Sequence, residues 1–218
     1  EPSFPGPYIV KPRFGGSSIG IEIVDDLATA RTLALTSPHL GAGAVLEPYR
    51  PHLVDLNISF RTWPALELTE VERPLRAEGE TTGLYSYQEK YLAGGGAGLT
   101  HAPREFPAQA PPAVHTAAAE LATAVAEVTR LTGIVRVDLL WDETTGDVFV
   151  NEVNTIPGAL SLYLWAPTHP ALRVLEDALC EARDNPVVFP QSGFGQGVAL
   201  RAAGGIAGKL VGLDGPRG

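Results

Sequence analysis

The chain has 218 residues, and 44% of them are hydrophobic, which is enough for a core of ordinary size. Its net charge of −9 and isoelectric point near 5.0 argue against a general nucleic-acid binder, so any anionic ligand must be held by local positive charge or by a metal. A single Cys excludes an intrachain disulfide framework and a multi-cysteine metal site, which predicts a reducing, cytoplasmic setting. No apolar run reaches transmembrane length, so we expect no membrane partner.

The first segment predicts two strands joined by a glycine-rich loop. Tyr8–Lys11 and Ile19–Val24 have strand character, and the sequence RFGGSS lies between them at Arg13–Ser18. Such a loop, with a Lys at its base, can place backbone N–H groups on phosphate oxygens. The order GxxxxGK[ST] of a phosphate-binding loop is absent, so an ordinary glycine-rich hairpin turn is the competing interpretation.

A short helix and a strand that ends in a carboxylate come next. Asp25 and Asp26 cap a predicted helix that runs to Ser37, with an expected buried stripe of Leu27, Ala30, Leu33 and Ala34. Ala44–Tyr49 (AVLEPY) is a predicted strand. Glu47, near its end and followed by a proline, could accept hydrogen bonds from a ligand in a cleft, and an edge position explains it equally well.

Two further strands and a long polar loop precede the next helix. Leu53–Thr62 and Ala65–Val71 are the predicted strands, with Asp55 and Asn57 on one face of the first. The segment Glu72–Pro107 is polar and glycine-rich, with tyrosines and a lysine at its centre. Loops of this length in compact domains are often functional lids, and disorder is the competing interpretation.

Two amphipathic helices are predicted in the second half of the chain. Pro112–Leu131 has apolar residues at helical spacing that we expect to be core, namely Ala118, Leu121, Val125, Val128 and Leu131. His169–Asp184 is the second helix, with an expected buried stripe of Leu172, Leu175 and Leu179. The Gly/Ala-rich tail 191–218 has no pattern that assigns it a role.

The segment Thr132–Leu164 predicts a β-hairpin around which the rest of the chain is organised. Ile134–Trp141 and Val148–Val153 alternate apolar and polar residues, and the turn-forming sequence DETTGD separates them. We expect Leu140 to pair with Val150, which leaves a short loop between the two strands.

This pairing places four functional side chains on one face of the hairpin. Asp138 then lies opposite Glu152, and Arg136 opposite Asn154. Two facing carboxylates repel and are costly to bury without a partner. Mg²⁺ bound to phosphate solves both problems, because it prefers one or two carboxylates together with substrate phosphates. A solvent-facing strand pair with incidental charges is the alternative.

Taken together, these segments resemble the ATP-grasp superfamily, and within it the D-alanine–D-alanine ligase group. The resemblance covers roughly residues 7 to 185. Five motifs carry it, in the order of the family and with ordinary spacings. They are YIVKPRFGGSSIGI (Tyr8–Ile21), AVLEPY (Ala44–Tyr49), YSYQEKYL (Tyr85–Leu92), GIVRVDLLWD (Gly133–Asp142) and VFVNEVNTIPGALSLYLW (Val148–Trp165).

The resemblance implies an α+β fold of antiparallel sheets with packed helices, in which two subdomains grip ATP between them. Residues 1–75 would form the small subdomain and residues 76–190 the C-terminal subdomain with the metal and acceptor sites. The family's N-terminal substrate domain has no counterpart in this sequence. Because the chain begins with Glu and contains no Met, we expect it to be a processed or excised piece.

The resemblance also implies a nucleotide site. Lys11 would contact the α- and β-phosphates, Lys90 would reach the phosphates from the long loop, and Ser17 would close over the triphosphate. Glu47 would accept from the adenine amino group, and Asp55 would bind the ribose. The backbone of residues 47–49, which includes Pro48 and Tyr49, would lie on the ring edge. Pro48 departs from the Lys that is common in the family.

The reacting groups would lie on the hairpin and the loop that follows it. Asp138, Glu152 and Asn154 would hold Mg²⁺, with Mn²⁺ as an alternative, and Arg136 would stabilise the acyl phosphate and the tetrahedral intermediate. In the exit loop, Gly158 and Ser161 would position the acceptor. The exit loop GALSLYLW is about two residues shorter than in standard ligases, which puts D-alanine as the acceptor in doubt.

The implied function is an ATP-dependent, ADP-forming carboxylate–amine ligase that acts through an acyl phosphate. Its partners would be small amino acids or peptides, with no nucleic acid and no membrane, and a homodimer is left open. A nucleotide-binding module without ligase turnover is the second hypothesis, because the N-terminal region is absent. An α/β protein without a nucleotide site is the third, and it requires five coincidental motifs.

Overall fold

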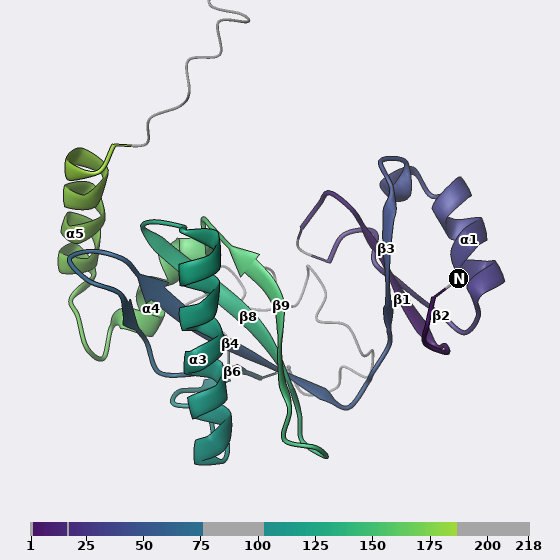
Figure 1. Cartoon of the computed structure of the whole chain (residues 1–218), viewed down its shortest axis with the longest axis horizontal. Helices are drawn as coiled ribbons and strands as arrows, with labels where there is room; N and C mark the ends of the chain where they lie inside the picture. The colour runs from purple at the N-terminus through teal and green to yellow at the C-terminus, as the bar shows by residue number, and fades with distance from the viewer. Residues whose placement is uncertain (1, 17, 76–102, 187–218) are drawn as a thin grey trace, which may run out of the picture. The chain divides into compact units, whose positions relative to one another are not determined.

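The computed structural model describes residues 2–16, 18–75 and 103–186 (Figure 1). The chain divides into two compact units, Glu1–Asp184 and Asn185–Gly218, and only the first is described in detail. Ser17, Lys90, most of the predicted lid and the predicted tail lie outside the described residues.

A three-stranded antiparallel sheet begins the fold. Strand β1 (Tyr8–Pro12) lies between β2 (Glu22–Val24) and β3 (Ala44–Pro48). The predicted helix is confirmed as α1 (Leu27–Thr36), followed by the short 3₁₀ helix η1 (Pro38–Leu40). An Asp26 oxygen accepts a hydrogen bond from the Thr29 backbone N–H at 2.8 Å, and this cap fixes the start of α1. The core of this part consists of Tyr8, Val10, Val24, Ala30 and Leu40.

A second, four-stranded antiparallel sheet has the order β5-β4-β8-β9. Its members are β4 (Leu53–Arg61), β5 (Glu67–Leu68), β8 (Ile134–Asp142) and β9 (Val148–Asn154). Helix α3 (Pro112–Thr129) covers one face of this sheet (Figure 1). That face is apolar, and its fully buried side chains are Leu56, Ile58, Phe60, Val135, Val137 and Leu139.

The predicted stripe of α3 is confirmed in part, because Ala118 is fully buried and Leu121, Val125 and Leu131 are partly buried against the core. The buried residues of the helix are Val114, Ala118, Ala122 and Ala126. Val128, which the spacing places in the core, is 84% exposed. The large side chains flank the contact and the small alanines form its centre, because small side chains allow a helix to pack closely on a sheet. The helix ends at Thr129, because Arg130 adopts a left-handed conformation with a φ of 53°.

Helix α5 (Ala171–Asp184) is also predicted in the right place but with the wrong buried face. Leu172 and Leu179 are 68% and 72% exposed, while Val174, Asp177 and Glu181 are buried. The buried carboxylates face polar partners at the end of β4. Asp177 accepts from Arg61 at 2.6 Å, and Glu181 accepts from the Thr62 hydroxyl at 2.6 Å. The packed side of α5 is therefore the side whose buried carboxylates have hydrogen-bond partners, and not the side of its leucines.

Short elements occur in segments predicted as loops. Strand β6 (Arg73–Pro74) pairs with β7 (Arg104–Glu105) on either side of residues 76–102. The exit loop contains the 3₁₀ helix η3 (Gly158–Ser161) and the one-turn helix α4 (Leu162–Trp165). Of the predicted strand at residues 65–71, only β5 forms. No helix in the described ranges has the length and apolar character that crossing a bilayer needs.

Candidate active site on the polar face of the four-stranded sheet

The hairpin has the predicted pairs at its functional end and a different register beyond them. Asp138 lies opposite Glu152, and Arg136 opposite Asn154, which confirms both predicted pairs. The predicted pairing of Leu140 with Val150 is wrong, because Val150 lies opposite Leu139 instead. One extra residue, Asn151, stands in β9 between the two registers and forms a β-bulge. Bulges often re-aim side chains next to active sites, and sequence alternation does not reveal them.

Strand β4 extends the polar face that the hairpin begins. Asn57 lies opposite Asp138, and Ser59 lies opposite Arg136, so all four side chains share one side of the sheet. Asp55, two residues before Asn57, is on the same face and is half-buried. The sheet therefore has an apolar face under α3 and a polar face on its other side.

Arg136 and Asp138 form a bidentate ion pair on this face. The guanidinium donates from Nε to Asp138 Oδ1 at 2.6 Å and from Nη2 to Oδ2 at 2.9 Å. The two side chains are only 16% and 14% exposed. Burial by itself would lower the pKa of Arg136, but the hydrogen bonds and charge of Asp138 outweigh it and raise the pKa above its ordinary value. The site thus contains a fixed, permanent cation.

The neighbouring oxygen donors suit a hard divalent cation. Asp138 and Glu152 face each other, and Asn154 follows on the same face. The Asn154 side-chain nitrogen is buried without a hydrogen-bond partner in the protein, which calls for an explanation. In the described part of the chain, no three His, Cys, Asp or Glu residues gather as a metal site. Two carboxylates and an amide fit Mg²⁺ or Mn²⁺ when phosphate oxygens complete the shell.

A buried carboxylate that the sequence analysis missed borders this face. Glu72 is 3% exposed, and its backbone exchanges two hydrogen bonds of 2.8 Å with that of Asn57. Its Oε2 accepts from the Asn57 amide at 3.1 Å and from the Tyr163 hydroxyl at 3.3 Å, and Arg104 lies 3.3 Å from Oε1. Only the position of Asn57 on the predicted polar face could have pointed to this cluster.

The cluster is electrostatically coupled to Arg136. Burial raises the pKa of Glu72, although Asn57 and the charges of Arg104 and Arg136 oppose the shift. Burial, and then the charge of Glu72, raise the pKa of Tyr163 to about 12, and the charge of Arg136 opposes this rise. The hydroxyl of Tyr163 therefore stays protonated and can donate to a carboxylate.

The exit loop has an unusual backbone. Ala159, Leu160 and Ser161 are consecutive left-handed residues with φ values of 48°, 50° and 51°. Each costs about 1–2 kcal/mol for an L-residue other than Gly, so the conformation persists only because its surroundings impose it. Ser161 is fully buried, and its hydroxyl has no hydrogen-bond partner in the protein. Strain and an unpaired polar group together are typical of a ligand-binding segment.

The predicted nucleotide residues of the small sheet occupy the ends of β1 and β3. Lys11 Nζ lies 2.7 Å from Glu47 Oε2, and it also donates to Asn151 Oδ1 at 3.3 Å. The Tyr49 N–H donates to the Pro7 carbonyl at 2.9 Å, and Pro48 has no N–H. Backbone carbonyls, more than N–H groups, are therefore available at this strand end.

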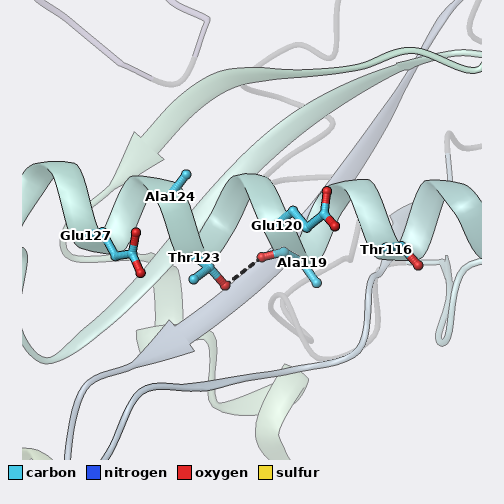
Figure 2. Close-up of a pocket in the computed structure, with 6 residues that line it drawn as sticks. All are labelled: Thr116, Ala119, Glu120, Thr123, Ala124 and Glu127. Atoms are coloured by element: carbon cyan, nitrogen blue, oxygen red, sulfur yellow. Dashed lines mark hydrogen bonds between the residues drawn. The ribbon is translucent and has the colours of Figure 1, made fainter.

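A surface hollow lies elsewhere on the molecule. It is lined by α3 alone, with the residues Thr116, Ala119, Glu120, Thr123, Ala124 and Glu127 (Figure 2). The Thr123 hydroxyl donates to the Ala119 carbonyl of its own helix at 2.8 Å, as Figure 2 shows. No predicted site residue lines this hollow, so we do not assign it to the active site.

Comparison with known proteins identifies the family. Residues 2–169 match the model of the family described as "D-ala D-ala ligase C-terminus". A D-alanine–D-alanine ligase of Acidiphilium cryptum is 34% identical over 154 residues, which cover 71% of this chain and 46% of that protein. The corresponding ligase of Deinococcus radiodurans is 32% identical over 155 residues, which cover 70% of this chain and 42% of that protein. The chain therefore spans about half the length of the curated relatives it matches.

Solved structures support the same fold. D-alanyl-alanine synthetase A of Vibrio cholerae superposes with a TM-score of 0.65 at 21% identity, covering 82% of this chain and 53% of that one. The VanG D-Ala:D-Ser ligase of Enterococcus faecalis has a TM-score of 0.60 at 18% identity, and the match covers 82% of this chain and 50% of that one. The expected α+β architecture is confirmed. The chain belongs to the family described as the D-Ala–D-Ala ligase C-terminus, and its fold is the ATP-grasp fold.

Proposed function

We propose that the protein containing this chain is an ATP-dependent, ADP-forming carboxylate–amine ligase. The observation that carries the proposal is the register of β8 and β9, which sets Arg136 and Asp138 opposite Asn154 and Glu152. This face combines a permanent cation with oxygen donors for a metal that binds phosphates. The family supports the same reaction, since its named relatives are D-alanine–D-alanine ligases.

The reaction has two group-transfer steps. A carboxylate oxygen of the donor attacks the γ-phosphorus of ATP, and the bond from this phosphorus to the β-phosphate oxygen breaks to release ADP. The acceptor amine then attacks the acyl carbon, loses a proton and displaces inorganic phosphate. Both steps need charge neutralisation and alignment more than a protein nucleophile.

The chain's own residues supply those requirements in the proposed site. Asp138, Glu152 and Asn154 would hold the metal, which when bound neutralises charge on the phosphates of ATP. Arg136 would lie against the transferring phosphoryl group and the oxyanion of the tetrahedral intermediate, because its fork is fixed by Asp138. Ser161, buried and unpaired in the exit loop, would position the acceptor together with Gly158.

The remaining binding residues would hold the nucleotide. Lys11, Lys90 and Ser17 would contact the phosphates, and Lys11 would exchange Glu47 for a phosphate oxygen when ATP binds. Glu47 would then be free to accept from the adenine amino group, with carbonyls of Pro48 and Tyr49 at the ring edge. Asp55 would bind the ribose.

The substrates are proposed as small amino acids or peptides. The relatives are named for D-alanine. The strained exit loop, which is short and would contact the acceptor, gives a reason for a different acceptor in this protein. The subdomain division at residues 75 and 76 and a separate tail from residue 191 stay predictions, which limited proteolysis would test.

A substrate screen tests the proposal directly. The purified full-length protein is incubated with ATP, Mg²⁺ and pairs of amino acids of both stereochemistries, and phosphate and ADP are measured together. We expect equal amounts of both products, formed only when a carboxylate donor and an amine acceptor are present. ATP binding without product for any pair would favour a nucleotide-binding module instead. D-alanine as the sole productive acceptor would contradict the altered acceptor preference.

A further inference from the structure

The strained exit loop leads directly into helix α4, and two aromatic side chains of this helix are bound to the four-stranded sheet and its border. The three left-handed residues end at Ser161, and α4 begins at the next residue. Tyr163 donates its hydroxyl to Glu72 Oε2 at 3.3 Å. Trp165 donates its indole N–H to Ser59 Oγ at 3.2 Å. An isolated one-turn helix is not stable in water, so contacts of this kind determine where α4 lies.

Both contacts are made beside the functional residues of the polar face. Ser59 is fully buried and lies in β4 opposite Arg136. Its hydroxyl donates to a backbone carbonyl of β8 at 2.8 Å, so the oxygen that receives the indole N–H is itself fixed. Glu72 exchanges two backbone hydrogen bonds with Asn57, which lies opposite Asp138. Helix α4 is therefore attached next to the two residues on which the proposed chemistry depends.

An arginine lies over each of the two aromatic rings. The Arg104 guanidinium lies 4.4 Å from the centroid of the Tyr163 ring and 3.3 Å from Glu72. The Arg61 guanidinium lies 5.3 Å from the centroid of the Trp165 ring, and a buried carboxylate of α5 holds it at 2.6 Å. Such cation–π contacts strengthen when they are removed from water. Each ring is thus held by a hydrogen bond and by a stacked cation.

These anchors explain why the left-handed residues of the exit loop persist. Ala159, Leu160 and Ser161 adopt a conformation that is unfavourable for L-residues, so the loop would relax if α4 were released. Leu160 is partly buried against the small core that contains Trp165. The buried Ser161 hydroxyl would change its position in such a relaxation. The contacts of α4 therefore determine where this unpaired hydroxyl lies.

We propose that Tyr163 and Trp165 are positioning residues for the acceptor amine. Through α4 they hold the exit loop in its strained shape, and this shape fixes the Ser161 hydroxyl where the acceptor binds. The inference rests on the proposed function, because it takes Ser161 as an acceptor-binding residue. Loss of either anchor weakens binding of the acceptor and leaves formation of the acyl phosphate nearly unchanged.

Amide hydrogen exchange, measured by mass spectrometry on the full-length protein, tests the anchoring without turnover. Peptides that cover residues 158–165 are compared with peptides of α3 in the wild type, in Tyr163→Phe and in Ser59→Ala. Ser59→Ala removes the acceptor of the Trp165 indole and leaves the sequence of the exit loop intact. We expect the exit-loop amides to exchange about tenfold faster in both variants, with α3 unchanged. Wild-type exchange of the exit loop in both variants would overturn the inference.

Kinetics with the donor and acceptor that the screen returns give a second readout. In Tyr163→Phe and Ser59→Ala, the KM for the acceptor should rise about tenfold, while the KM for ATP stays within about twofold. Tyr8→Phe is the matched control and should change neither value, because it removes a phenol hydroxyl that donates to the Phe4 carbonyl near the other sheet. Wild-type acceptor KM in both variants would overturn the inference.

Hydroxylamine separates the two chemical steps in the same variants. It converts an acyl phosphate to a hydroxamate with release of phosphate, and it does not need the acceptor site. With hydroxylamine in place of the acceptor, hydroxamate formation in both variants should stay within about twofold of the wild-type rate. A loss of hydroxamate formation as large as the loss of acceptor use would contradict a role limited to the acceptor.

The two proposals fail in different experiments. If the wild-type protein forms neither product nor hydroxamate with any donor, the proposed function is wrong and the positioning role falls with it. If the wild type turns over and both variants keep the wild-type acceptor KM and exit-loop exchange, the function stands and only the positioning role is wrong.

Discussion

In the structure, a buried ion pair anchors helix α5, and its leucines do not. Replacing Arg61, one partner of this ion pair, tests the assignment. Arg61 is 5% exposed, and it donates to Asp177 at 2.6 Å and from Nε to Glu67 at 2.8 Å. Its guanidinium also lies over the Trp165 ring, 5.3 Å from the centroid. Asp177, on α5, is 4% exposed. We expect Arg61→Met to destabilise the protein strongly.

The magnitude follows from what each substitution leaves behind. Arg61→Met leaves the Asp177 carboxylate buried, with the largely exposed Arg173 at 3.0 Å as its one remaining charged partner among the described residues, so the free energy of unfolding should fall by about 3–5 kcal/mol. Asp177→Asn leaves Arg61 with Glu67 and keeps an acceptor oxygen, so its cost should be lower, at about 1–3 kcal/mol. The main prediction is that Arg61→Met lowers the free energy of unfolding more than Asp177→Asn does.

Urea unfolding of the purified protein measures these changes. With a slope of about 2 kcal/mol per molar urea, Arg61→Met should lower the midpoint by about 1.5–2.5 M. Leu172→Ala is the matched control on the same helix, because Leu172 is 68% exposed, and it should change the unfolding free energy by less than about 0.5 kcal/mol. A larger effect of Leu172→Ala than of Arg61→Met would refute the assignment of the buried face.

Three further predictions concern the site. ATP should bind only with Mg²⁺ or Mn²⁺, because the facing carboxylates of Asp138 and Glu152 repel phosphates; equal affinity in excess EDTA, measured by calorimetry, would count against the metal site. Arg136→Ala should largely spare ATP binding but abolish phosphate release. Wild-type turnover in that variant would contradict the role of Arg136 in stabilising the transferring phosphoryl group. The pKa of Tyr163 is raised from 10 to about 12 on folding, so its stabilising contribution is complete below pH 10 and is lost as the pH rises through 12. Urea midpoints should therefore fall more steeply across this range for wild type than for Tyr163→Phe, and parallel curves would contradict the buried environment of the hydroxyl.

The functional end of the hairpin could be predicted from sequence because its signals are local. The predicted register pairs Asp138 with Glu152 correctly, but the observed pairs at the turn would by strict alternation set Asp138 opposite Asn151, so the bulge at Asn151 is what brings Glu152 opposite Asp138. The register beyond this point was not predictable, because the bulge at Asn151 changes the pairing without changing the residue types. The chemistry of the site therefore follows from the sequence, while the pairing toward the turn does not.

Contacts between distant segments account for what the sequence did not predict. The leucine spacing of α5 indicates a helix correctly, but its packed side is decided by Arg61, more than 100 residues away in the chain. Glu72 lies in a segment whose polar, glycine-rich sequence predicts a loop, and its burial depends on Arg104 and Tyr163 from two other segments. Charged residues satisfied by distant partners break the rule that apolar periodicity identifies the core.

Oxygen-isotope transfer tests the central claim most directly. A donor substrate identified by the screen is labelled with ¹⁸O in both carboxylate oxygens, and the phosphate released by the full-length protein is analysed by mass spectrometry. Attack of the carboxylate on the γ-phosphorus predicts one ¹⁸O in each phosphate released with ADP, because the bridging oxygen leaves with the phosphate. Unlabelled phosphate, or AMP with pyrophosphate in place of ADP, would contradict an acyl-phosphate ligase.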